Sequence, residues 1–432
     1  MIEPLENWRK QMTCVNHYQN FINDRIKGID LWLDNHKEFF NPYNISDKDT
    51  TFLYRKSFCE YSLYLYVCDK HEIKDKSHAL KTQFLNHLND DRFLQLAKRH
   101  RELFLAFGLP IAIAKHLYGV TPPLSEYFTK ELNSQHSRSL ELVPFRMMDY
   151  VFAAQIFGDI EHIFPVNKLS KMSNYYRLPD PILADESQAY ALTHNIFYLT
   201  GMQRRADFLA LNVDFDHGVN KVLEALLLKY IAKKDLDLSL ELLASLALIG
   251  HCKKWHIELV FSAITQSMEN DDVIPGPVGR IGDDVRALHG DKFHHWAKNY
   301  HTMLVAAMCL RIINDQLSDI TADESIFDLG TLNSLGHMQR LAAEYNLPLL
   351  LALFNSIENE GEIINSMGLG HIVNNTKSFI DSQRREDSYL GYFHDEKGKH
   401  KENQHKFENS VLASIKKIDQ CINWNKLTFN EH

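Results

Sequence analysis

The chain has 432 residues, of which 45% are hydrophobic and 24% are charged, and its formal net charge is −9 at neutral pH. This composition is that of a globular protein and excludes disorder as the main state. An acidic balance without a block of Lys and Arg argues against binding to nucleic acids or anionic membranes, because that affinity depends on clustered basic residues.

The sequence predicts a cytoplasmic protein without a membrane segment. The first ten residues, MIEPLENWRK, lack the basic and apolar regions of a signal peptide. The longest apolar run without charges, residues 103–114, is shorter than the 18 or so residues that a bilayer requires. The cysteines are dispersed and form no CxxC motif, which is typical of reduced thiols.

Nearly the whole chain has the periodicity of α-helices. Apolar residues recur at spacings of three and four, and the few Gly and Pro residues fall between the periodic stretches. Pro123 lies where a first helical turn is expected, and Asp185 with Gln188 has the spacing of a capping box. We therefore expect more than half of the residues to be helical and no sheet of more than two or three strands.

Six strongly apolar segments each follow one ionisable residue. Their separations range from 42 to 60 residues, and more polar, amphipathic segments lie between them, at 81–99, 124–132, 217–233 and 255–268. A helix that is apolar around most of its circumference must be enclosed, whereas an amphipathic helix needs one covered face. The residues that precede the apolar segments are Glu60, Glu102, Asp149, His194, Glu241 and His301.

This alternation predicts an all-α fold, an α/α toroid of about six helical hairpins, over residues 1–380. An open α-solenoid is the alternative, although solenoids normally show polar terminal repeats. Residues 336–357 resemble a seventh apolar helix. Residues 381–432 are expected to form a charged connection and a C-terminal helix that packs on the same domain.

One insertion interrupts the repeat. Residues 270–295 contain the densest Gly, Pro, Asp and His content of the chain and are expected to be a loop. Its apolar residues need burial, so we expect it to cover one mouth of the ring and to move on its glycines. These residues are Val273, Ile274, Ile281 and Leu288.

The aligned ionisable residues are the first candidate site. In a toroid they occupy one level of the inner helices and converge on a central cavity, where buried charges shift one another's pKa values. His194 and His301 are the candidate proton-transfer pair. Tyr198 and Tyr300 would orient the substrate, and Glu60, Asp149 and Glu241 would set the tautomers and pKa values of the imidazoles. The alternative is that the acids mark first helical turns and that the histidines belong to the core.

A metal site is a second possibility, near the insertion. Imidazole and carboxylate are normal ligands of zinc, iron or manganese, but the spacing matches no closed motif such as HExxH. The candidate ligands are His289, Asp291, His294 and His295, close to His301. No dinucleotide, P-loop or esterase motif is present, so the sequence identifies no cofactor.

Four phrases resemble an uncharacterised bacterial family. They are RKSFCEYSLYL at 55–65, THNIFYLTG at 193–201, DDVIPGP at 271–277 and NYHTMLVAAMCL at 299–310. Members of that family carry a TH-x-x-FY-x-T-D-F-G phrase and are often encoded near natural-product genes. Here Gly201, Met202 and Gln203 replace the Asp-Phe-Gly. The resemblance implies a helical toroid and a biosynthetic setting.

Together these patterns favour an enzyme that applies acid–base chemistry to a small, partly apolar biosynthetic intermediate in the mouth of the toroid. The substrate is a small molecule, carried free or on a carrier or peptide. A non-catalytic scaffold for a partner protein or carrier domain is one alternative. A glycan-processing enzyme that places two carboxylates about 5 Å or about 6.5–9.5 Å apart is another.

Overall fold

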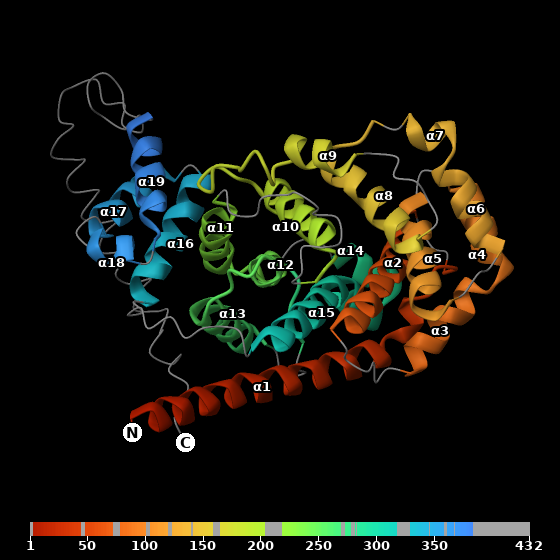
Figure 1. The fold of residues 1–432 in the computed structure, drawn as a ribbon, viewed down its shortest axis with the longest axis horizontal. Helices are drawn as coiled ribbons and strands as arrows, with labels where there is room; N and C mark the ends of the chain where they lie inside the picture. Colours follow the sequence, from red (N-terminus) through yellow and green to blue (C-terminus); the bar gives the residue numbers. More distant parts are fainter. Residues whose placement is uncertain are drawn as a thin grey trace.

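The protein is all-α, as the periodicity predicted. The computed structural model describes residues 3–44, 48–71, 78–100, 104–119, 123–139, 141–158, 165–203, 218–268, 273–277, 281, 283–317, 329–344, 346–357, 361–366 and 368–382. Within these ranges the regular elements are α-helices and one 3-10 helix, without any β-strand (Figure 1). No helix in the described part of the chain is long and apolar enough to cross a membrane.

Six helices contain or directly follow the aligned ionisable residues. They are α2 (Lys48–Lys70), α5 (Phe104–Tyr118), α8 (Pro144–Phe157), α10 (Glu186–Thr200), α12 (Leu236–Leu248) and α15 (Asp291–Gln316). Each packs against the next in this order, and α15 packs in turn against α2, so the six contacts close a cycle. We call these six the inner helices.

The other helices cover this cycle from outside. In chain order they are α1 (Glu3–Asn35), η1 (Lys37–Phe39), α3 (His78–Leu88), α4 (Asp91–Arg99), α6 (Pro123–Leu132), α7 (Gln135–Arg138), α9 (Val166–Met172), α11 (Val219–Ala232), α13 (Lys254–Ser267) and α14 (Asp283–His289). The long helix α1 runs along one side of the molecule and packs on α15 (Figure 1). The expected alternation of apolar and amphipathic helices is therefore present.

Four more helices extend one end of the molecule beside α11 (Figure 1). They are α16 (Leu329–Ala343), α17 (Leu347–Ile357), α18 (Gly361–Ser366) and α19 (Gly370–Ser382). The expected seventh helix is two helices, α16 and α17, because Pro348 can occupy a first turn but cannot continue a helix from α16. At Gly336, α16 approaches α11 so closely that an added Cβ would lie 2.3 Å from the Leu228 carbonyl oxygen. The expected C-terminal connection and helix, 383–432, lie outside the described residues.

Local signals in the sequence set the ends of the inner helices. Asp185 accepts a hydrogen bond from the Gln188 amide at 2.8 Å and donates its own amide to the Gln188 side chain at 3.1 Å, which confirms the capping box at the start of α10. Gly201 ends this helix with a φ of 60°, a left-handed conformation that favours glycine. Asp235 caps α12 through the Leu238 amide.

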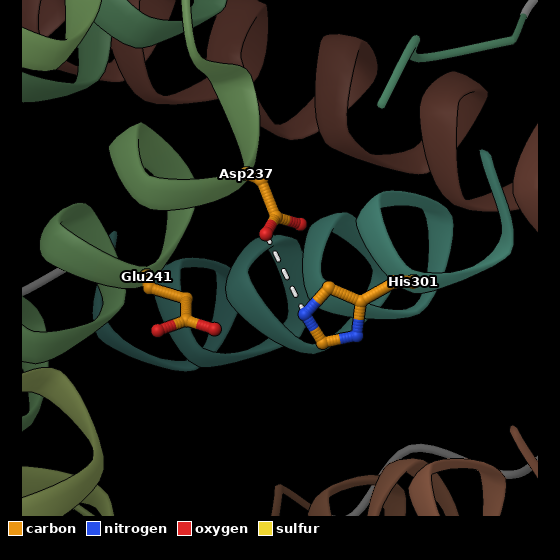
Figure 2. A group of neighbouring side chains, drawn as sticks. All are labelled: Asp237, Glu241 and His301. Carbon is orange, nitrogen blue, oxygen red and sulfur yellow. Dashed lines mark ion pairs between the residues drawn. The ribbon is translucent and has the colours of Figure 1, made fainter. Parts of the chain in front are cut away.

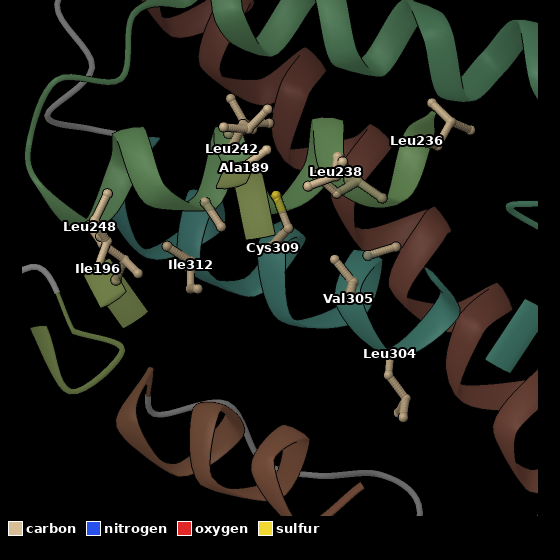
Figure 3. Packing of buried hydrophobic residues seen from close by; sticks show 14 of the residues in the cluster. Ala189, Ile196, Leu236, Leu238, Leu242, Leu248, Leu304, Val305, Cys309 and Ile312 are labelled. Atoms are coloured by element: carbon tan, nitrogen blue, oxygen red, sulfur yellow. The ribbon is translucent and has the colours of Figure 1, made fainter. Parts of the chain in front are cut away.

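The core is most continuous between α10, α12 and α15. Every residue of α12 is buried, which is what an enclosed helix requires. Figure 3 shows Leu238 and Leu242 of α12 packing near Cys309 and Ile312 of α15 and near Ala189 of α10. The ionisable residues of α12, Asp237 and Glu241, are buried among these apolar side chains, so packing fixes their orientation.

The insertion at 270–295 is only partly a loop, which corrects the sequence prediction. Residues 283–289 form α14, and α15 begins at Asp291, so His294 and His295 belong to a helix. Val273 and Ile274 are buried as expected, but Leu288 is 74% exposed. The described part of the segment packs on α15, where the Gly276 amide donates to Asn299 Oδ1. None of the residues described in this segment lines the central cavity.

Candidate functional site

A cavity of about 550 Å³ lies inside the cycle of inner helices, and all six contribute to its wall. This volume is in the range of small-molecule sites, which is about 300–1,000 Å³. Its wall is mostly apolar, with Phe52, Phe145, Phe152, Phe197, Leu109, Leu304 and Met308 among its residues. Its polar lining residues are Lys56, Glu60, Arg146, Asp149, Ser187, Tyr190, His194, Tyr198, Glu241 and His301.

Most of the candidate residues from the sequence meet in this cavity. Glu60, Asp149, His194, Tyr198, Glu241 and His301 all line it. Tyr300 does not: it is buried behind the wall, where its ring stacks on Trp296 with 4.7 Å between the centroids. Glu102 lies outside the described residues. The acids do not mark first turns, since Glu60, Asp149 and Glu241 each lie well inside their helices.

His301 lies between two carboxylates and one of these is held by a lysine. Its Nδ1 is 3.1 Å from Glu60 Oε2, and its Nε2 is 3.5 Å from Asp237 Oδ2. Lys56 Nζ is 3.1 Å from the other oxygen of Glu60. Burial alone would lower the pKa of His301, but Asp237 and Glu60 raise it to about 9. Burial opposes ionisation of Glu60, yet His301 and Lys56 lower its pKa to about 2.

Glu241 and Asp237 lie one helical turn apart on α12. Thr193 Oγ1 donates to Glu241 Oε2 at 2.6 Å. Asp237 accepts from the Tyr190 hydroxyl at 2.5 Å and from Thr302 Oγ1 at 2.8 Å. Burial and then the charge of Asp237 raise the pKa of Glu241 to about 8. Glu241 therefore holds its proton at neutral pH as long as no cation lies between it and Asp237.

The backbone fixes the tautomer of His194. Its Nδ1 is 2.7 Å from the carbonyl oxygen of Tyr190, one turn earlier on α10. A carbonyl oxygen can only accept, so Nδ1 carries the proton and the neutral ring has its lone pair on Nε2. Glu241 Oε2 lies 3.7 Å from the same Nδ1. Burial lowers the pKa of His194, so the ring has the weaker affinity for a proton of the two imidazoles.

Asp149, Tyr198 and Arg146 form the third polar group of the cavity. Arg146 reaches forward one turn of α8 to Asp149, with 3.1 Å between the guanidinium and Oδ2. Burial raises the pKa of Asp149, and Arg146 and Tyr198 counteract this. Burial and the Asp149 charge hold the pKa of the Tyr198 hydroxyl well above its usual value. Tyr198 is therefore a neutral hydrogen-bonding group over the whole neutral range.

Comparison with protein families places residues 27–310 in a domain family of unknown function. The chain belongs to the DUF6895 domain family. No curated protein and no solved structure matches the chain. The resemblance to an uncharacterised family that covers most of the chain is thus confirmed at that level. The DUF6895 region contains every cavity-lining residue except Ile312.

Asp237, Lys56 and Tyr190 of this DUF6895 protein are not among the site residues predicted from the sequence. The apolar pattern assigned one ionisable residue to each apolar segment, whereas α12 carries two, and Lys56 lies one turn before Glu60 on α2. The signal was present in the spacing, because residues four apart share a helix face. Asp237 precedes Glu241 by four residues, as Tyr190 precedes His194.

The histidine-rich segment does not form the suggested metal site. His289, Asp291, His294 and His295 are not gathered around one point; His295 lies beside Trp32 and His36, and Arg286 pairs with Asp291. Within the described residues, the group whose ligand atoms lie close enough to share an ion is Asp237, Glu241 and His301 (Figure 2). His289 ends α14 and the other three candidates lie in the first turns of α15, where successive residues point in different directions.

Proposed function

We propose that this protein is an enzyme that transfers protons on a small, partly apolar substrate bound in the central cavity. The observation that carries this proposal is the convergence of two imidazoles and several carboxylates, each with a fixed partner, on one mostly apolar cavity. Individually solvated polar residues would instead be expected of a scaffold surface. The closed order of the inner helices supports an α/α toroid over an open solenoid, because an open array has no contact between its first and last helices.

His194 is the proposed base. Its Nε2 lone pair is available because Nδ1 donates to the Tyr190 carbonyl, and no described group forms a hydrogen bond with Nε2. The ring is part of the cavity wall next to Phe145 and Phe197. A base fixed in one tautomer and surrounded by aromatic side chains needs no reorientation before it accepts a proton. His301, on α15, supplies the second imidazole of the proposed pair.

The wall of the cavity indicates the class of substrate. Aromatic and aliphatic side chains dominate it, which favours a partly apolar molecule over an oligosaccharide. Tyr198, with its hydroxyl beside Asp149, would orient a polar group of the substrate. Tyr300 has no such role in this proposal, since it does not reach the cavity.

The biological setting that we propose follows from the sequence. The phrase at 193–201 resembles a bacterial family associated with natural-product genes, so the substrate would be a biosynthetic intermediate, free or attached to a carrier or peptide. The dispersed cysteines, without a CxxC motif, support a cytoplasmic location, where thiols stay reduced.

The test uses solvent deuterium because the substrate is unidentified. Purified protein is incubated in D2O with a small-molecule extract of the producing cells, and mass spectrometry identifies each compound whose amount or deuterium content changes. The same incubation is made with His194→Gln, which retains a neutral hydrogen-bonding group. We expect at least one compound to change, and its rate to fall by roughly 10²–10⁴-fold in the variant, the usual contribution of general acid–base catalysis.

Thermal denaturation of the variant is the control. A catalytic His194 predicts nearly unchanged melting, whereas a core histidine predicts a loss of about 1–3 kcal/mol in the free energy of unfolding. If no compound changes with the wild-type protein, or if the variant is as active as the wild type, the proposal is wrong. Copurification of an unmodified carrier protein with an inactive cavity would favour the scaffold function.

A further inference from the structure

Three metal-ligating side chains, of which Glu241 and His301 line the cavity, lie close together at its wall. Asp237 and Glu241 project from one face of α12, and His301 projects towards them from α15, which packs beside α12 (Figure 2). One ligand atom of each residue lies within 4.8 Å of those of the other two. His301 Nε2 and Asp237 Oδ2 are 3.5 Å apart. Two ligands bound at about 2.1 Å to one tetrahedral ion are about 3.4 Å apart, so the spacing suits a shared ion.

The two carboxylates and the imidazole are held in place by further side chains. Thr302 binds Asp237 Oδ1, Tyr190 binds Asp237 Oδ2, and Thr193 binds Glu241 Oε2. The outer nitrogen of the imidazole, His301 Nδ1, is 3.1 Å from a Glu60 carboxylate oxygen. A carboxylate behind the histidine and hydroxyl groups behind the carboxylates are the outer partners that orient ligands in metal sites.

A second observation points to a ligand at this place. Glu241 is 2% exposed and lines the cavity, and its carboxyl group accepts the hydrogen bond of Thr193 at Oε2, so Oε1 is open to a ligand from the cavity. An ionised carboxylate in so enclosed a position is costly unless a cation or a donor reaches it. Lys56 already pairs with Glu60. A divalent ion together with Lys56 would balance the three carboxylates Glu60, Asp237 and Glu241, with His301 neutral.

We propose that Asp237, Glu241 and His301 bind one divalent transition-metal ion, with zinc as the best match. One imidazole and two carboxylates form a ligand set for zinc and, with more ligands, for manganese or iron. Three protein ligands leave a position open towards the cavity, as in catalytic sites. The ion would act there as a Lewis acid on a substrate oxygen. Use of the ion in catalysis rests on the proposed function, whereas metal binding itself does not. With an ion bound, His301 would be a ligand and would no longer transfer a proton.

The experiment measures binding of zinc alone by isothermal titration calorimetry, with the full chain freed of metals by a chelator. We expect one ion per chain and a higher melting temperature with zinc, because the ion binds the folded state. Asp237→Asn, Glu241→Gln and His301→Gln should each weaken binding by at least roughly 100-fold, since loss of an outer partner already costs about 10–100-fold. His194→Gln should leave the affinity within a few-fold of wild type.

His256→Gln is the matched control. His256 is a buried imidazole 3.5 Å from the carboxylate of Glu224, but its neighbours are lysines instead of a second carboxylate. It should bind zinc like the wild type. Where a ligand variant fails to fold, cobalt(II) in the wild-type protein gives a separate reading: its visible spectrum should indicate four or five nitrogen and oxygen ligands and no thiolate, although Cys309 lines the cavity.

Absence of stoichiometric binding, or equal affinity in Glu241→Gln and His301→Gln, would overturn the metal site. A thiolate band from cobalt(II) would also overturn it. These outcomes are separate from those of the proton-transfer test. Zinc binding without any changed metabolite would contradict the proposed function and leave the metal site standing. A His194-dependent reaction in a protein that binds no zinc would contradict the metal site and leave the proposed function standing.

Discussion

Single buried charges in this protein are held by specific partners, and Arg311 shows how much depends on one of them. Its side chain is 1% exposed and lies 3.0 Å from Asp30 of α1, which also accepts from the Tyr64 hydroxyl. We expect Asp30→Asn to lower the free energy of unfolding by about 3 kcal/mol, because the guanidinium then stays buried without its counterion. Urea unfolding measures this. Asp24→Asn on the same helix, whose pair with Lys27 is exposed, should change it by less than about 0.5 kcal/mol.

Most of the candidate residues could be predicted from the sequence because they are ionisable residues next to strongly apolar segments. His194, Glu241 and His301 each interrupt an apolar segment, and a polar side chain in an enclosed helix needs a partner or a ligand. What each does depends on neighbours from other helices. The Tyr190 carbonyl sets the tautomer of His194, a local effect, whereas the environment of His301 comes from α2 and α12.

Pairs of helices are joined by buried charges as well as by apolar contact, and Glu224 joins α11 to α13. It is fully buried and lies within 3.1 Å of Lys221, 3.4 Å of Lys253 and 3.5 Å of His256. Burial opposes its ionisation, but His256 and the two lysines lower its pKa to about 2. The unfolded chain has the ordinary value of 4.5, so it binds the proton first as the pH falls.

The stabilisation from Glu224 is therefore complete above pH 4.5 and is lost as the pH falls towards 2. We expect the difference in unfolding free energy between wild type and Glu224→Gln to shrink by about 2 kcal/mol between pH 5.5 and pH 3, at 1.36 kcal/mol per pH unit. Chemical unfolding at a series of pH values measures it. A difference that stays constant over this range would show that Glu224 is not ionised in the folded protein.

The central cavity is a property of the whole molecule, since it exists only where six inner helices meet. Ala244 of α12 lines it, whereas Ala247, three residues on, is buried in the packed core. Ala244→Leu should fill cavity space, abolish the deuterium exchange described above and change the unfolding free energy by less than about 1 kcal/mol. Ala247→Leu should lower that free energy by about 1–3 kcal/mol through overpacking. Equal destabilisation by both would mean that the cavity is closed to side chains and to ligands.

The sequence by itself determined the helices, because their periodicity, caps and breaks are local. It gave the all-α class, the alternation of enclosed and covering helices, and the start of α10 at Asp185. It also selected His194, Glu241 and His301, since each one is a polar residue in an apolar run. It predicted a loop over the whole insertion, although 283–289 and the residues from 291 onwards are helical, because the Gly, Pro and charged residues of the segment obscure the helical pattern.

Only the tertiary structure decided which of these residues meet. Asp237 and Glu241 face His301 because α12 packs on α15, a contact that bridges about 60 residues of chain and has no local signal. In the same packing Tyr300 lies away from the cavity, and His289, Asp291 and His294 are distributed over α14 and the start of α15. Helical order arises from neighbours within four residues, whereas a site arises from which helix faces are buried against each other, and burial depends on the whole chain.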